Sequence, residues 1–297
     1  MGTPNYAKEI LQSLIDDEYI EISLVLTQPD RKAGRKSELK APDVKVLALE
    51  YGLEILQPEK LSEEGIYDAI VDTKPDYIVV AAFGQMLPKT ILDIAPCINL
   101  HASLLPQYRG ASPVQQSLLN SDEFTGVTAM LMEEGLDSGP ILGYRYFKIP
   151  ETMILSELMS RLSDDASALT IKTIHNFEKI EPIVQIRAEA TYCKKIKKAD
   201  GLVSFSDMKE LYNKYRAYFG WPGVFVDGGT KISDIRLFDD KKSEINGEIL
   251  AINESSIVVS GANASIEIET IQAPSKKAVN AKDYCVGRGK KVGDTLF

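Results

Sequence analysis

The segment that most limits the possible folds is DYIVVAAF, residues 76–83, a nearly unbroken run of β-branched, aromatic and small apolar side chains. Such a run is typical of a strand in a parallel sheet with both faces covered, because neither face shows the polar alternation of an exposed sheet. Parallel strands are joined by crossover connections, which are usually helices. The segment therefore favours an α/β layer structure.

Strand and helix patterns alternate around this segment, as an α/β domain requires. Further strands are expected at residues 20–27 (IEISLVLT), 53–58 (LEILQP), 97–101 (CINLH) and 127–132 (VTAMLM). Helices are expected at residues 5–15, 42–51, 88–94 and 155–177. The pattern predicts a doubly wound α/β domain.

The composition changes after residue 177, and the basic cluster KKIKK at residues 194–198 ends a predicted linker. Beyond a helix-like segment at residues 211–219, short alternating strands are separated by Gly, Asn and Asp turns. A small antiparallel barrel fits this second part best. We therefore expect two domains, residues 1–187 and residues 188–297.

The start of the chain departs from this scheme. Residues 1–4, MGTP, form a turn that leads directly into the first helix, whereas a doubly wound domain normally opens with a strand before such a turn. We expect several further residues before Met1 in the natural product, and the intact mass of the natively expressed protein would test this.

Composition and charge exclude several classes of protein. No apolar run reaches the roughly 18 residues of a membrane span, and no signal peptide is recognisable, so the cytosol is the expected compartment. Three widely spaced cysteines argue against a disulfide framework or a thiolate zinc site. The net charge is −9, but residues 1–187 carry −11 and residues 188–297 carry +2. Local basic surfaces can therefore still bind RNA.

The candidate catalytic residues begin with one of only two histidines. In an extended segment, Asn99 and His101 project to the same face, and they come at the carboxyl end of a strand, where open α/β sheets bind ligands. The alternative is a purely structural role, in which both side chains only form hydrogen bonds with backbone groups of the loop. His175, in a helical stretch, is expected to be a surface or packing residue.

Two further segments make the catalytic interpretation more attractive. SLLPQYRGASP, residues 103–113, is too apolar for an ordinary exposed turn and too broken for a helix, so it could wall a pocket for a flat ligand. Asp137 lies between Gly135 and Gly139, which allow tight turns that fix a carboxylate. It could only cap that turn, or it could orient the His101 imidazole and stabilise its charged form.

No nucleotide-phosphate loop, HExxH motif, metal-spaced cluster or GxSxG elbow is present, so the sequence predicts a metal-independent enzyme.

Two segments, INLHASLLPQYRGASPVQ and TGVTAMLMEEGLDSGPIL, resemble the signature of the folate-dependent formyltransferases. Five others resemble the methionyl-tRNA-specific branch of that superfamily: GTPNYA, TQPDRKAGRKSELKAPDVKVLA, TYCKKIKKADGLVSF, YRAYFGWPG and IQAPSKKAVNAKDY.

This resemblance implies a Rossmann-like formyltransferase domain followed by a C-terminal OB-type barrel that assists tRNA binding. The implied reaction transfers the formyl group of 10-formyltetrahydrofolate to the α-amino group of methionine on initiator tRNA, in the cytoplasm, without a metal or a membrane, and by a monomer. The implied catalytic residues are Asn99, His101 and Asp137, and the implied tetrahydrofolate contacts are Ser103, Leu104, Leu105 and Pro106. The tRNA-binding candidates are Arg31, Lys32, Arg35, Lys36, Lys40, Lys194, Lys195, Lys197 and Lys198.

Two alternatives remain open at this point. A folate formyltransferase with a small acceptor, such as a glycinamide ribonucleotide or an amino-sugar nucleotide, or a formyltetrahydrofolate hydrolase, would use the same three catalytic residues. The basic loop expected at residues 31–40 and the appended barrel argue against it, because a small acceptor needs no RNA-sized surface. A noncatalytic tRNA-binding protein would keep the basic patches, but it would not need the three catalytic residues.

Overall fold

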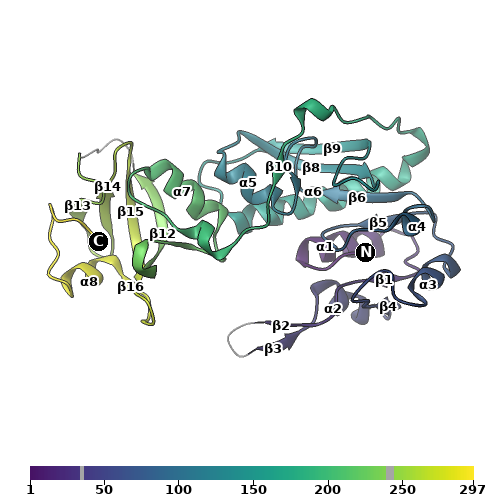
Figure 1. Cartoon of the computed structure of the whole chain (residues 1–297), viewed down its shortest axis with the longest axis horizontal. Coiled ribbons are helices and arrows are strands. Elements are labelled where there is room, and N and C mark those ends of the chain that lie inside the picture. Colours follow the sequence, from purple (N-terminus) through teal and green to yellow (C-terminus); the bar gives the residue numbers. More distant parts are fainter. Residues whose placement is uncertain (34–36, 239–243) are drawn as a thin grey trace. The chain divides into compact units, whose positions relative to one another are not determined.

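The computed structural model describes residues 1–33, 37–238 and 244–297, and its chain divides into two compact units (Figure 1). The N-terminal unit comprises Met1–Pro113, Phe124–Lys148 and Met159–Lys194. The C-terminal unit comprises Lys195–Phe297 together with Val114–Glu123 and Ile149–Leu158. The domain boundary between residues 187 and 188 stays a prediction.

The N-terminal unit is built on a mixed sheet. Strand β5 (Ile78–Val80) pairs in parallel with β6 (Cys97–His101), which continues antiparallel through β8 (Phe124–Leu131) to β9 (Ile141–Lys148). A separate parallel pair is formed by β1 (Val25–Leu26) and β4 (Ile55–Leu56). Met1 and Gly2 link the two sheets, because the Gly2 N–H donates to Leu26 O and the Ala81 N–H donates to Met1 O, both at 3.0 Å.

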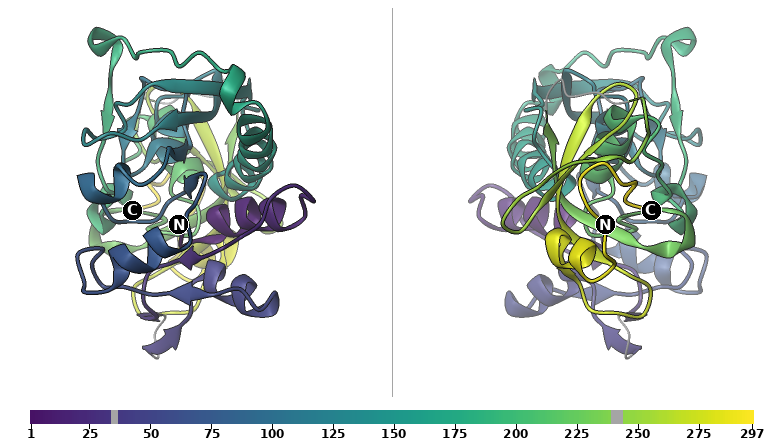
Figure 2. Two further views of the ribbon diagram at one scale, coloured as in Figure 1. Left: turned by 90° about the vertical axis from the view of Figure 1, so that its right-hand side faces the viewer. Right: turned by 90° about the vertical axis from the view of Figure 1, so that its left-hand side faces the viewer.

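Helices follow the strands in the order that an α/β domain requires. In the N-terminal unit they are α1 (Asn5–Ile15), α2 (Asp43–Glu50), α3 (Ile66–Asp72), α4 (Lys89–Leu92) and most of α6 (Leu155–His175). Helix α5 (Pro113–Leu119) lies almost entirely in the C-terminal unit. Along α6 the buried residues Leu158, Leu162, Ala166 and Leu169 form one stripe at helical spacing. An ion pair of 2.7 Å between Arg145 of β9 and Asp165 of α6 ties this helix to the sheet, beside which it runs in Figure 2.

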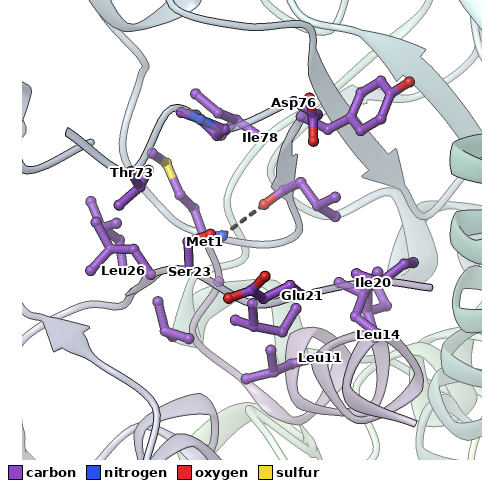
Figure 3. Close-up of a pocket in the computed structure, with 18 of the residues that line it drawn as sticks. Met1, Leu11, Leu14, Ile20, Glu21, Ser23, Leu26, Thr73, Asp76 and Ile78 are labelled. Atoms are coloured by element: carbon purple, nitrogen blue, oxygen red, sulfur yellow. Dashed lines mark hydrogen bonds between the residues drawn. The ribbon is translucent and has the colours of Figure 1, made fainter. Parts of the chain in front are cut away.

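Two sequence-based expectations for this unit need correction. The strand expected at residues 20–27 is paired only at Val25–Leu26. Residues 20–24 instead line a cavity of about 540 Å³ together with Met1 and residues 73–79 (Figure 3). The apolar run alone does not show where the strand ends, because a strand also requires a neighbouring strand to which its backbone is hydrogen-bonded. The basic stretch 31–40, expected as a loop, contains the antiparallel strands β2 (Arg31–Ala33) and β3 (Glu38–Lys40).

The remaining elements of the N-terminal unit follow α6 or pair with the segment that follows it. Strand β7 (Arg109–Gly110) pairs in parallel with β10 (Tyr192–Cys193). Two 3-10 turns lie between α6 and β10, η1 (Phe177–Lys179) and η2 (Arg187–Glu189). Residues far apart in sequence therefore meet beside β6, the strand that carries the candidate site.

The C-terminal unit is built on an antiparallel sheet, which confirms the antiparallel strands that the turn-rich pattern predicts, while closure of the sheet into a barrel stays a prediction. Its strands are β11 (Val224–Phe225), β12 (Lys231–Phe238), β13 (Ile249–Ile252), β14 (Ile257–Ser260), β15 (Ser265–Gln272) and β16 (Val279–Asn280). The pairing order is β11-β12-β15-β14-β13, with β16 added to β15, so within the described residues hydrogen bonding does not join β11 to β13.

Helices α7 (Met208–Ala217) and α8 (Ala281–Val286) complete this unit, with the 3-10 turns η3 (Lys198–Gly201) and η4 (Asp227–Gly229). The core joins Met208 and Leu211 of α7 to strand residues such as Ile232, Ile257 and Ile268. Burial of these apolar side chains is the main stabilising force of the sheet. Among the described residues, no helix is both long enough and apolar enough to cross a membrane.

Candidate active site

The end of β6 places an amide and an imidazole side by side. Asn99 and His101 lie opposite Met130 and Thr128 of β8, and the two side chains share a face because strand residues alternate. Asn99 is 9% exposed and His101 is 7% exposed. Both polar groups are thus held in a largely dry setting, where a hydrogen bond or a charge acts more strongly than in water.

The two ring nitrogens of His101 face different oxygen atoms. Nε2 lies 2.9 Å from the carbonyl oxygen of Tyr108, which can only accept, so Nε2 carries a proton in this arrangement. Nδ1 lies 3.8 Å from Oδ2 of Asp137. That separation exceeds a hydrogen bond, so an Nδ1–H would remain available to an oxygen atom of a bound substrate.

Asp137 is fixed by the turn that follows β8. Its φ is +46°, a left-handed conformation that aspartate tolerates better than most residues. Its Oδ2 accepts a hydrogen bond of 2.8 Å from the backbone N–H of Gly110. The carboxylate therefore faces His101 with one oxygen held by the backbone.

The loop after His101 is held by its own hydrogen bonds. The Ser103 hydroxyl donates to Gln107 O at 2.6 Å. The Thr128 hydroxyl donates to Ser103 O at 2.6 Å and accepts from the Leu105 N–H at 3.0 Å. Ser103 and Leu105 are buried, whereas Leu104 and Pro106 are half-buried. The loop therefore presents a rigid, partly apolar surface beside Asn99 and His101.

The segment after α6 contributes contacts to this loop from residues that were not predicted from the sequence. The Tyr108 N–H donates to the Thr191 hydroxyl, and the Arg109 N–H donates to Thr191 O, both at 2.9 Å. Cys193 lies beneath the loop, where its Sγ accepts from the Ser112 N–H at 3.3 Å. Burial raises the pKa of the Cys193 thiol, so this sulfur is a packing group and not a thiolate nucleophile.

Arg109 and Gln185 are two further residues near the site that were not predicted from the sequence. Their side chains are hydrogen-bonded to each other, and Gln185 contacts the backbone on both sides of the Asp137 turn. Arg109 lies in the SLLPQYRGASP segment, and an arginine in such an apolar loop could have been recognised from the sequence as a candidate site residue. Gln185 lies in a segment without a motif, so only the tertiary structure reveals it.

The basic candidates lie on two exposed segments. Arg31, Lys32 and Lys40 are exposed on β2 and β3, where Arg31 pairs with Glu59 at 2.8 Å. Arg35 and Lys36 lie outside the described residues. The second segment, whose lysines are all exposed, follows β10 and carries Lys194, Lys195, Lys197 and Lys198.

The 540 Å³ cavity is separate from the candidate site, because none of Asn99, His101 and Asp137 lines it. Within residues 1–33, 37–238 and 244–297, no group of three or more His, Cys, Asp and Glu side chains could hold a metal ion. The site offers an amide donor, an imidazole and a carboxylate. These groups suit the transfer of an acyl group to a nucleophile, in which an oxyanion develops and protons move.

The fold and the site therefore define an acyl-group transferase with a Rossmann-like catalytic domain and an antiparallel β domain. The formyl transferase family matches residues 1–174, and the C-terminal domain of formyl transferases matches residues 195–289. The chain is 57% identical to "Methionyl-tRNA formyltransferase" of Sulfurovum sp. and 49% identical to the protein of that name in Nitratiruptor sp.. Each match covers 100% of this chain and 98% of the relative. The chain belongs to the formyl transferase family, in its methionyl-tRNA formyltransferase branch.

Solved structures of more distant proteins share the fold. A sugar 3N-formyl transferase, WlaRD, superposes with a TM-score of 0.68 at 19% identity, covering 93% of this chain and 97% of its own. An N-formyltransferase from Helicobacter canadensis superposes with the same TM-score at 18% identity, covering 91% and 97%. At this identity the likeness concerns the fold alone.

Proposed function

We propose that the protein transfers the formyl group of 10-formyltetrahydrofolate to the α-amino group of methionine carried by initiator tRNA. This proposal rests on the placement of Asn99, His101 and Asp137 close together beside the end of β6. It is supported by the similarity of the whole chain to methionyl-tRNA formyltransferases. Translation initiation in the cytoplasm is the process that uses the product, so we place the enzyme there. We also expect the enzyme to act as a monomer.

The proposed first step is attack of the neutral amine on the formyl carbon. The new C–N bond turns the formyl oxygen into an oxyanion, which needs hydrogen-bond donors at its final position. The Asn99 carboxamide and the Nδ1–H of His101 supply them, since they project from the same face of one strand. Their burial supports this role, because donors in a dry site need little reorganisation as charge develops.

The proposed second step is the movement of two protons. The attacking nitrogen must lose one, and Asp137 accepts it directly or through one water molecule, while its Oδ2 stays held by Gly110. The bond between the formyl carbon and the folate nitrogen then breaks, and that nitrogen takes a proton from His101. The products are N-formylmethionyl-tRNA and tetrahydrofolate.

The binding surfaces are part of the same proposal. Ser103, Leu104, Leu105 and Pro106 form the wall against which the folate lies, with the half-buried Leu104 and Pro106 offering contact area and the buried pair shaping the loop. The cations of residues 31–40 and 194–198 bind tRNA phosphates, and all of them that the structure describes are exposed. Their charge acts locally even though the whole chain is acidic.

The direct test is transfer of a labelled formyl group from 10-formyltetrahydrofolate to three acceptors supplied in parallel. These are methionine-charged initiator tRNA, methionine-charged elongator tRNA and free methionine. Transfer to the charged initiator, well above transfer to the other two, is the expected result. Release of formate without transfer would instead point to a hydrolase or to a small-acceptor formyltransferase.

A further inference from the structure

We propose that Gln185 is a positioning residue for Asp137 and that Arg109 holds Gln185 in its working orientation. The inference rests on the proposed function, because it assigns a role towards the carboxylate that receives the proton of the attacking amine. Gln185 lies 48 residues after Asp137 in sequence, in the segment between α6 and β10. It would make this segment part of the catalytic machinery and not only a connection to the C-terminal unit.

The side-chain amide of Gln185 bridges the turn that carries Asp137. Its Nε2 donates to Asp137 O at 2.9 Å and to Gly139 O at 2.7 Å. An amide NH₂ has two hydrogens, so both bonds form at once. The bridge spans Ser138 and fixes the backbone on either side of it. This matters because Asp137 has a positive φ, which a turn holds only when its surroundings restrain it.

Arg109 determines which way the Gln185 amide points. Its Nε and Nη2 donate to Gln185 Oε1 at 3.1 and 2.6 Å. A guanidinium can only donate and backbone carbonyls can only accept, so a flipped amide would lose all four hydrogen bonds. Arg109 is 3% exposed and Gln185 is 7% exposed, and unpaired polar atoms at such burial are costly. The pair therefore has one favourable arrangement.

The residue that follows Arg109 also restrains Asp137, in this case through its carboxylate. Gly110, directly after Arg109, donates its N–H to Asp137 Oδ2 at 2.8 Å. Residues 109–110 thus hold the carboxylate oxygen directly and the backbone of the turn through Gln185. The double restraint keeps the carboxylate 3.8 Å from Nδ1 of His101. Displacements of about 1 Å at a reacting group can reduce turnover on the order of 100-fold.

The test uses Gln185→Glu, which keeps an oxygen partner for Arg109 but places a carboxylate oxygen against two carbonyl oxygens. We expect kcat for formyl transfer to fall about 10- to 100-fold, with KM for the folate and for charged initiator tRNA within about 3-fold. In an Asp137→Asn background, the same substitution should lower kcat by less than about 2-fold, because residues that act through one group are not additive.

Two controls separate positioning from stability. Asp165→Asn weakens the two ion pairs that the buried Asp165 carboxylate makes with the exposed Arg145 of β9 and Arg161 of α6, in the same unit. It should lower Tm and leave kcat at 25 °C unchanged. Should Gln185→Glu fail to fold, Gln185→Met and Arg109→Lys, measured well below their Tm, repeat the comparison. A drop in Tm with wild-type kcat, or a full additional loss in the Asp137→Asn background, would overturn the proposal.

Failure of this inference is distinguishable from failure of the proposed function. If Asp137→Asn itself retained wild-type turnover, the assigned site would be wrong, whatever Gln185 does. If Asp137→Asn lost activity while Gln185→Glu did not, the site would stand and only the positioning role would fall.

Discussion

At the scale of single residues, the proposed reaction depends on Asn99 as a donor to the oxyanion. We expect Asn99→Ala to lower kcat by about two to three orders of magnitude, the usual loss for one oxyanion donor. The affinity for 10-formyltetrahydrofolate should change little, because the interaction develops only in the transition state. Single-turnover transfer together with equilibrium folate binding measures both quantities. Weakened folate binding with normal turnover would contradict the assigned role.

Gly110 is the second residue whose replacement is informative. Its φ is +114°, and a Cβ at this position would meet the carbonyl oxygen of Cys193. Gly110→Ala should therefore disturb the β7–β10 pair and the hydrogen bond to Asp137, reducing kcat about 10-fold or more and stability by about 1–3 kcal/mol.

Gly52 provides the matched control for that substitution. Its φ is +66°, but a Cβ there has no neighbour within 4 Å. Gly52→Ala should cost about 1–2 kcal/mol of conformational energy and leave kcat unchanged. Chemical denaturation and steady-state kinetics on both variants make the comparison. Equal effects on kcat would show that Gly110 acts only through general stability.

At the scale of elements, α7 shows how one side chain begins a helix. Asp207 Oδ1 accepts from the Glu210 N–H and from Asn263 Nδ2, both at 2.8 Å. These hydrogen bonds, the first of them foremost, hold the pKa of the Asp207 carboxyl below its ordinary value. The charged form is thus favoured in the folded state, and the cap depends on pH.

We expect Asp207→Ala to destabilise the protein by about 1 kcal/mol near pH 7, the usual loss of an N-cap. Because the folded pKa is lowered, the stabilisation is present above the unfolded pKa and is lost as pH falls through the folded pKa. The difference from wild type should therefore shrink towards about pH 3. Asp207→Asn keeps a capping oxygen and should lose little. Urea denaturation at several pH values tests this, and a pH-independent difference would contradict it.

At the scale of the whole molecule, the proposed function requires an acidic chain to bind an anionic substrate, and we expect local basic segments to make these contacts. Removing one lysine that pairs with a phosphate should reduce the slope of log K against log salt by about 0.7–0.9. Replacing the four lysines of residues 194–198 by glutamine should flatten the slope by up to about 3 and weaken tRNA binding most at low salt.

The control variant replaces four other lysines by glutamine, so that the net charge changes by the same amount. These lysines are exposed and scattered over the N-terminal unit: Lys60, Lys89, Lys172 and Lys179. That variant should keep most of the wild-type slope, since a change in net charge alone leaves the protein–phosphate ion pairs in place. Filter binding or fluorescence anisotropy over a salt series measures both. An identical slope in the 194–198 variant and in wild type would remove this segment from the interface.

Much of this molecule could be predicted from local sequence. Strand β6 matches its expected range, Cys97–His101, and so does helix α1, Asn5–Ile15. Asn99 and His101 share a face because side chains alternate along any strand. The short strands of the C-terminal unit were visible as apolar runs between turns. These features depend on periodicity and turn residues, which are properties of neighbouring residues in the chain.

Other features were decided only by tertiary structure. Val25–Leu26 is the paired part of a longer apolar run, because a strand needs a partner at each position. Asp137 comes near His101 because β6 and β8 pair, and Gln185 reaches Asp137 because the segment after α6 returns to β7. No local pattern encodes these meetings. Hydrogen bonds between distant segments form only once the chain has folded, and burial then makes each partner costly to lose.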